Sequence, residues 1–148
     1  MKPLLNIKNH IFIIAFALLN LVGLVSTNAA TINVSSITAL QNACNNSNSG
    51  DIIILANGTY QNVTLNINNN NITIKAQTFG SVFLNGYDDI TISGNYVTFS
   101  GFQFTSGDIG SNYLIKVAGD YNKLTHLNFS NYYAKKYIEI QAGTKYVI

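Results

Sequence analysis

Few side chains in this sequence are of a type that could move protons or hold a metal ion. Asp88 and Asp89 are the only adjacent acidic pair, and paired carboxylates can act in acid–base catalysis or contribute to a Ca²⁺ site. On a strand, however, neighbouring residues face opposite ways, whereas carboxylates in a turn accept hydrogen bonds from backbone amides. Because a Ca²⁺ site needs six or more converging oxygens, the pattern favours a turn.

The other charged candidates stand apart from one another. Lys135 and Lys136 could act as a base only if burial lowered a pKa, and their sequence context is typical of a solvated corner. Glu139, within YIEIQ, is predicted to point outward and alone, and His126, within LTHLNF, to be outward and solvated. The chain contains no arginine. We therefore assign no catalytic, cofactor-binding or metal-binding residue to this chain.

Tyrosine side chains could bind a ligand without cleaving it. Tyr132, Tyr133 and Tyr137 cluster near an expected corner, and exposed tyrosine rings can stack on sugars. Aromatic rings of solenoids also stack on one another as part of the structure. The sequence does not separate these two roles.

Short strands must position these residues. Runs rich in β-branched and aromatic residues alternate with turns rich in Gly, Asn and Asp, which is typical of β-structure. These runs are DIIILA, NVTLNI, NITIKA, SVFLNG, DITIS, YVTFSGFQF, YLIKVAG, NKLTHLNF and YIEIQ. One helix is predicted from Ile37 to Asn45, with Leu40 and Cys44 on its apolar face and Ser35 or Ser36 as its cap.

The strand pattern also repeats. ITISGNYVTFSGFQF begins at Ile90, the similar IKVAGDYNKLTHLNF begins 25 residues later at Ile115, and IEIQAGTKYVI begins 23 residues after that at Ile138. Such a period indicates stacked structural units, and these units contain no helix. The sequence therefore predicts an all-β fold, a solenoid of parallel strands, with sharp corners at Asn57–Gly58 and at residues 68–71.

Four phrases carry a resemblance to known protein families. GDIIILANGTY, after a short capping helix, resembles the first coil of the pectin-lyase-like right-handed parallel β-helix. ITIKAQTFGSVFLNG, YVTFSGFQFTSG and VAGDYNKLTHLNFSN follow in an order and spacing similar to polysaccharide lyase family six, which contains chondroitinase B and many alginate lyases. The resemblance runs from about Val34 to the end of the chain.

The resemblance implies β-elimination on an acidic, uronate-containing polysaccharide such as alginate or chondroitin/dermatan sulfate. In that family a Ca²⁺ ion neutralises the uronate carboxylate, a lysine acts as base and an arginine assists. These residues lie on later coils, so no catalytic residue is carried over, and Ca²⁺ is implied for the full-length family rather than for this chain.

The start of the chain indicates export. Lys2 and Lys8 precede the apolar run Ile11 to Val25, which small residues follow, and this is typical of a signal peptide over residues 1–30. A membrane anchor is the alternative, but the run is short for a stable span. We expect a secreted protein, extracellular or periplasmic, with one domain at 31–148 that is apparently truncated at its carboxyl end.

Charge and cysteine content limit the kinds of partner and the crosslinks that this chain can have. After residue 30 six lysines balance six acids, so nucleic-acid binding is not expected, and the single cysteine, Cys44, excludes an intrachain disulfide. The leading hypothesis is the amino-terminal, non-catalytic part of a secreted polysaccharide lyase. The alternatives are a non-catalytic β-helix protein that binds carbohydrate or adheres, and a truncated gene product. Whether this chain is an enzyme is left open.

The signal-peptide interpretation is tested by amino-terminal sequencing of the expressed protein. We expect secreted material that begins near Ala30 or Thr31, because the small residues around Ala29 suit signal peptidase. Membrane-bound protein that retains Met1 would support the anchor instead.

Overall fold

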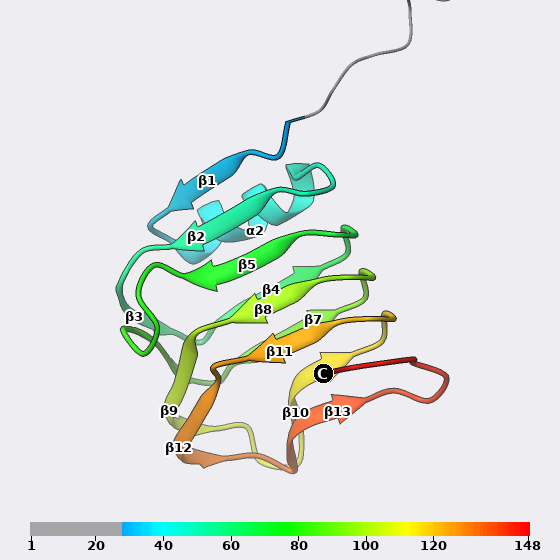
Figure 1. Cartoon of the computed structure of the whole chain (residues 1–148). Helices are drawn as coiled ribbons and strands as arrows, with labels where there is room; N and C mark the ends of the chain where they lie inside the picture. The colour runs from blue at the N-terminus through cyan, green and yellow to red at the C-terminus, as the bar shows by residue number, and fades with distance from the viewer. Residues whose placement is uncertain (1–27) are drawn as a thin grey trace, which may run out of the picture.

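The computed structural model describes residues 28–148, which form three parallel sheets around one apolar core (Figure 1). The first sheet contains β1 (Thr31–Val34), β2 (Ile52–Leu55), β5 (Thr73–Ala76), β8 (Thr98–Ser100) and β11 (Lys123–Thr125). The second contains β3 (Gly58–Gln61), β6 (Val82–Gly86), β9 (Phe102–Asp108) and β12 (Asn128–Tyr133). The third contains β4 (Thr64–Ile67), β7 (Asp89–Ile92), β10 (Tyr113–Val117) and β13 (Lys136–Ile140).

The chain visits the three sheets in turn, so that one strand from each sheet makes one coil. Neighbouring strands pair in parallel throughout these sheets, which confirms the predicted parallel β-helix. The sequence repeat is the pairing register itself, since Ile115 pairs with Ile90 of the coil before and with Ile138 of the coil after.

The core is built from the alternation of side chains along each strand. Ile53 and Leu55 of β2 are fully buried, and so are Ile90 and Ile92 of β7, because alternate residues of a strand point to the same side. Full burial of such a side chain contributes about 1.5–3 kcal/mol. Repeated in every coil, it is the main stabilising term of the solenoid.

The predicted helix is present as α2 (Ile37–Asn46). Ser36 is its cap, with Oγ accepting a hydrogen bond from the Ala39 amide at 3.1 Å, and Leu40 and Cys44 are buried. Burial raises the pKa of the Cys44 thiol to about 12, so this residue behaves as a small apolar side chain. The strand β1, which precedes the helix and pairs with β2, is not among the predicted strands, the first of which is DIIILA, from Asp51.

The corners fall at equivalent places in successive coils. A residue with positive φ occupies the corner that follows the third-sheet strand in each of four coils: Asn71, Tyr96, Tyr121 and Tyr146. The predicted turn at residues 68–71 belongs to this set, and the predicted corner at Asn57 leads directly into β3. In Figure 1 the turns before β5, β8 and β11 lie one above another.

The predicted signal peptide, residues 1–30, lies outside the described residues except for 28–30. Among residues 28–148, no helix is long and apolar enough to cross a membrane.

A buried asparagine ties the corners of two successive coils together. Asn122 is 1% exposed; its Oδ1 accepts from the Val97 amide at 2.7 Å, and its Nδ2 donates to the carbonyls of Gly94 and Gly119 at 2.9 and 2.8 Å. Val97, 25 residues earlier, is apolar and buried. The side chain at 122 is therefore polar because it must pair with backbone groups that water cannot reach.

We expect Asn122→Leu to lower the free energy of unfolding by at least about 2 kcal/mol, since a buried group left without a partner costs about 1–3 kcal/mol. The matched control is Asn128→Leu, where the asparagine is exposed and the change should stay within about 0.5 kcal/mol. Denaturant unfolding measures both, and equal effects at the two positions would contradict this account.

Candidate functional site

The six acidic side chains of the described residues are already engaged. Asp51 accepts hydrogen bonds from the amides of Ala30 and Asn48, which lower its pKa. Asp108 and Asp120 accept from the amides of Gly110 and Lys145. The remaining three are Asp88, which lies in the buried junction described below, and Asp89 and Glu139, which pair with lysines.

Two lysines that could act as bases are held in ion pairs. Lys116 Nζ lies 2.9 Å from Asp89 Oδ1. Lys136 Nζ lies 2.6 Å from Glu139 Oε2, and this contact raises the pKa of Lys136. The prediction that Glu139 stands alone is therefore wrong, because a residue three positions earlier on the same strand reaches its carboxylate. A raised pKa is also the opposite of what a lysine base needs at neutral pH.

The predicted acidic pair divides between two roles. Asp89 begins β7 and faces Lys116, whereas Asp88 is fully buried. Asp88 Oδ1 accepts from the Val63 amide at 2.8 Å, which confirms the prediction that a carboxylate here caps backbone. Its Oδ2 lies 3.1 Å from the hydroxyl of Tyr132, 44 residues further along the chain.

The Tyr132 hydroxyl meets three groups at once. It lies 3.0 Å from the Asp88 amide, 2.9 Å from the Gly86 carbonyl and 3.1 Å from Asp88 Oδ2. One phenol hydrogen cannot serve both a carbonyl and an ionised carboxylate. If Asp88 is protonated, its own hydrogen goes to Tyr132 and the phenol hydrogen goes to Gly86, so that every group is satisfied. Burial raises the pKa of Asp88 to about 6, so the protonated arrangement predominates below that pH.

Glycine at position 107 makes this junction possible. Gly107 of β9 pairs with Gly86 on one side and Tyr132 on the other. A Cβ atom there would lie 2.1 Å from Tyr132 Cε2 and 2.5 Å from the Gly86 carbonyl oxygen. The Tyr132 ring therefore crosses one whole coil to reach Gly86 and Asp88, and any side chain at 107 would block it.

An open groove lies over this junction and is the best candidate for a ligand site. It has a volume of about 360 Å³ and is lined by Gly107, Asp108, Asn131, Tyr132, Tyr133 and Tyr137. The predicted tyrosine cluster is therefore present. Tyr132 is 6% exposed and therefore packed, whereas Tyr137, whose ring stacks on Phe129 with centroids 4.9 Å apart, is 43% exposed and Tyr133 is 66% exposed. Tyr133 is the most exposed of the three rings and the one that a sugar could reach most readily.

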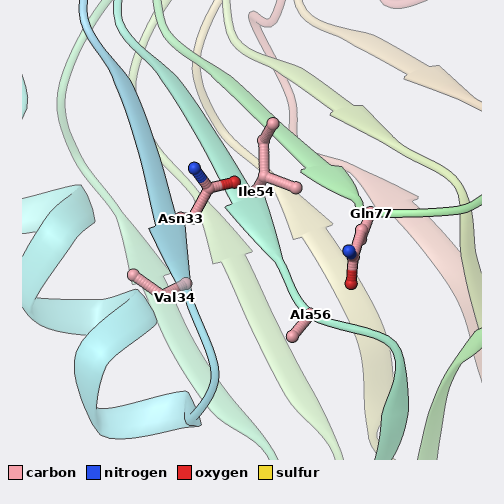
Figure 2. Close-up of a pocket in the computed structure, with 5 residues that line it drawn as sticks. All are labelled: Asn33, Val34, Ile54, Ala56 and Gln77. Atoms are coloured by element: carbon pink, nitrogen blue, oxygen red, sulfur yellow. The ribbon is translucent and has the colours of Figure 1, made fainter.

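A second hollow, of about 150 Å³, lies at the β1 edge of the first sheet (Figure 2). Its lining consists of Asn33, Val34, Ile54, Ala56 and Gln77. Figure 2 shows Asn33 and Val34 on β1 and Ile54 on β2. The lining carries no titratable group, so this hollow offers no acid–base chemistry.

The remaining candidates lie on the surface. His126 is exposed, as predicted, but it sits in the corner between β11 and β12 rather than within a strand, and its ring stacks on Phe79 at 4.5 Å. Lys135 is also exposed, with its Nζ 5.1 Å from the centre of the Tyr113 ring. The structure brings neither of them to the groove lining.

A Ca²⁺ ion does not fit the side chains of this part of the chain. Residues 28–148 contain no cluster of three or more His, Cys, Asp or Glu side chains, and their carboxylates are occupied by backbone amides, Tyr132 or lysines. Ca²⁺ needs six or more oxygens directed at one point. No step of any reaction is assigned to such an ion here.

The family model described as Chondroitinase B matches residues 34–142. The chain belongs to the chondroitinase B family. Among solved structures, it is similar to the PL6 family polysaccharide lyase Pedsa3628 from Pseudopedobacter saltans (TM-score 0.63, 26% identity) and to the PL6 family alginate lyase AlyGC (TM-score 0.63, 26% identity). The alginate lyase AlyF-OU02, whose structure is a complex with G6, is similar at TM-score 0.58 and 26% identity.

These matches cover most of this chain but little of the lyases. They include 66%, 67% and 70% of this chain and only 24%, 15% and 22% of the respective lyases. The chain thus spans about a quarter or less of the length of these members of its family. No match was found among curated proteins.

The Asp88 junction predicts a pH dependence of stability. Because the folded pKa of about 6 lies above the ordinary value of 3.8, folding favours protonated Asp88. The contribution of protonated Asp88 to the free energy of unfolding is complete below pH 3.8 and is lost as pH rises through 6. We expect Asp88→Asn to remove this loss, on the order of 2–3 kcal/mol, so that the variant gains stability relative to wild type as pH rises from 4 to 7.

Denaturant unfolding at a series of pH values measures the difference. The matched control is Asp120→Asn, because asparagine already fills the equivalent position at Asn95 and makes the same type of bond to the following coil. A pH profile of Asp88→Asn parallel to that of wild type would show that Asp88 is ionised in the folded protein.

Proposed function

We propose that this chain supplies the amino-terminal coils of a secreted polysaccharide lyase that acts by β-elimination on a uronate-containing polysaccharide. The observation that carries the proposal is the family match over residues 34–142, on a β-helix with a capping helix near its amino-terminal end. The solved relatives are named as polysaccharide and alginate lyases. The signal-like start of the sequence supports secretion.

The chemistry of the described coils supports a scaffold role. β-Elimination requires a base for the proton beside the uronate carboxylate and a cation that neutralises this carboxylate in the transition state. Here Lys116 and Lys136 are paired with carboxylates, and the chain has no arginine. What these coils supply instead is a rigid, helix-capped end with a fixed strand register, on which further coils can stack.

A non-catalytic carbohydrate-binding protein is the second candidate, and the open groove favours it. The exposed ring of Tyr133 beside Asn131 and Asp108 offers an aromatic face together with hydrogen-bonding groups, which is a common way to hold a sugar. If this candidate is correct, we expect the chain, and any longer form of it, to bind carbohydrate without cleaving it.

We expect purified residues 31–148 to show no lyase activity on alginate or dermatan-type polymers, with or without added Ca²⁺, because no base and cation converge on one site. The assay is the ultraviolet absorbance of the unsaturated uronate product. Product formed by this chain, and lost in Lys116→Ala or Lys123→Ala, would show that the active site lies here.

A chimera tests the scaffold role directly. In it, residues 34–142 replace the matching segment of the Pseudopedobacter saltans lyase. We expect the folded chimera to retain measurable elimination activity, because the reacting groups come from the coils that are kept. A folded chimera without activity would argue against the lyase proposal and in favour of the binding protein.

A further inference from the structure

Three tyrosines form a ladder on the surface of the solenoid. Tyr96, Tyr121 and Tyr146 occupy the same corner of successive coils, after the third-sheet strand. Their rings stack with centroids 4.9 and 5.2 Å apart, and they are 57%, 43% and 71% exposed. We call these three residues the tyrosine ladder. It lies on the line of turns visible before β8 and β11 in Figure 1.

The backbone alone does not account for tyrosine at these positions. The φ angles of Tyr96, Tyr121 and Tyr146 are 56°, 57° and 49°, in the left-handed region that L-residues other than Asn, Asp and Gly seldom adopt. The preceding coil has Asn71 at the same corner, with φ of 54°, which is the residue type that such a corner favours. Tyrosine is thus present in three coils against the preference of the backbone.

The hydroxyl groups of the ladder are available. Of the described tyrosines off the ladder, all but Tyr133 have hydroxyls in hydrogen bonds with other groups of the protein: Tyr60, Tyr87, Tyr113, Tyr132 and Tyr137. Within residues 28–148, the hydroxyls of Tyr96, Tyr121 and Tyr146 make no such bond. The ladder therefore presents a row of free donors at a spacing of one coil, over stacked rings that hold them in place.

The charges beside the ladder are mainly positive. Lys145 directly precedes Tyr146, and Lys123 follows Tyr121 by two residues; both lysines are exposed. The one nearby acid, Asp120, accepts a hydrogen bond from the Lys145 amide at 2.8 Å, as the side chains of Asn70 and Asn95 do for the amides of the coils that follow them. Anionic ligands suit this surface better than cationic ones.

We propose that the tyrosine ladder, with Lys123 and Lys145, is a binding surface for an anionic, uronate-containing polysaccharide that lies along the axis of the solenoid. The polysaccharide class rests on the proposed function. A row of equivalent donors with constant spacing matches a polymer whose hydroxyl and carboxylate groups recur along its length. The lysines pair with its carboxylates, and the phenol groups donate hydrogen bonds to it.

The substitutions Tyr→Phe and Tyr→Asn separate binding from structure. Y96F/Y121F/Y146F keeps the stacked rings and removes only the hydroxyls. Y96N/Y121N/Y146N removes the rings and places at each corner the residue found at Asn71, so the backbone preference is restored. If the ladder served the fold alone, the Phe variant would behave as wild type and the Asn variant would only lose stability.

The experiment measures the affinity of each variant for alginate by affinity electrophoresis and calorimetry. Dermatan sulfate and a neutral glucan serve as further probes. The melting temperature of each variant is measured alongside. We expect wild type to bind the anionic polymers more tightly than the glucan and less tightly as salt rises. The Phe variant should bind at least threefold more weakly at an unchanged melting temperature, and the Asn variant at least tenfold more weakly. K123Q/K145Q should lose most of the salt dependence.

The matched control is Tyr87→Phe, an exposed tyrosine off the ladder, which should bind as wild type does. Wild-type affinity in the Phe and Asn variants would overturn the inference, and so would the absence of any binding by the wild-type chain. Neither result would affect the chimera assay, so failure of the ladder proposal is distinguishable from failure of the lyase proposal.

Discussion

Parallel pairing between successive coils sets the position of nearly every other feature of this solenoid. Each strand hydrogen-bonds to the strand one coil before and one coil after it, as Ile115 does between Ile90 and Ile138. The register holds only if each coil returns to the same place after nearly the same number of residues. Corners, core residues and surface side chains are therefore brought into columns, and a residue's neighbours are mainly those one coil away.

Because equivalent residues of successive coils lie in columns, polar side chains can bridge one coil to the next. The side chains of Asn70, Asn95 and Asp120 each accept from the backbone amide of the residue one coil later, which satisfies corner amides that the sheets do not pair. The Asp88–Tyr132 junction extends this principle over two coils, because glycine at position 107 leaves room for the ring to cross the intervening coil. Such bridges hold the corners of the solenoid in fixed positions.

The same geometry separates scaffold from ligand-binding features. Inside the solenoid, side chains serve packing and backbone satisfaction, and outside it Lys116 and Lys136 are paired with carboxylates. The groups that remain free for a ligand are the ring of Tyr133 at the groove, the hydroxyls of the tyrosine ladder, and the exposed side chains of Lys123 and Lys145. A surface of this kind is suited to holding a polymer, whereas elimination also needs a base and a cation at one point.

Local sequence patterns were enough to predict the class of fold, the capping helix and the coil register: alternation along strands, the Ser36 cap with its apolar face, and the spacing of Ile90, Ile115 and Ile138. The same patterns located the corner at residues 68–71 and the tyrosine cluster. They did not reveal β1, since Thr31–Val34 is a short strand whose place depends on pairing with β2.

Other contacts became visible only when the coils were packed against one another. Glu139 pairs with Lys136, Asp88 contacts Tyr132 from 44 residues away, and Tyr96, Tyr121 and Tyr146 stack. These contacts depend on which side chains the coils place side by side, and on the space that glycine leaves between them, neither of which is encoded in any one segment.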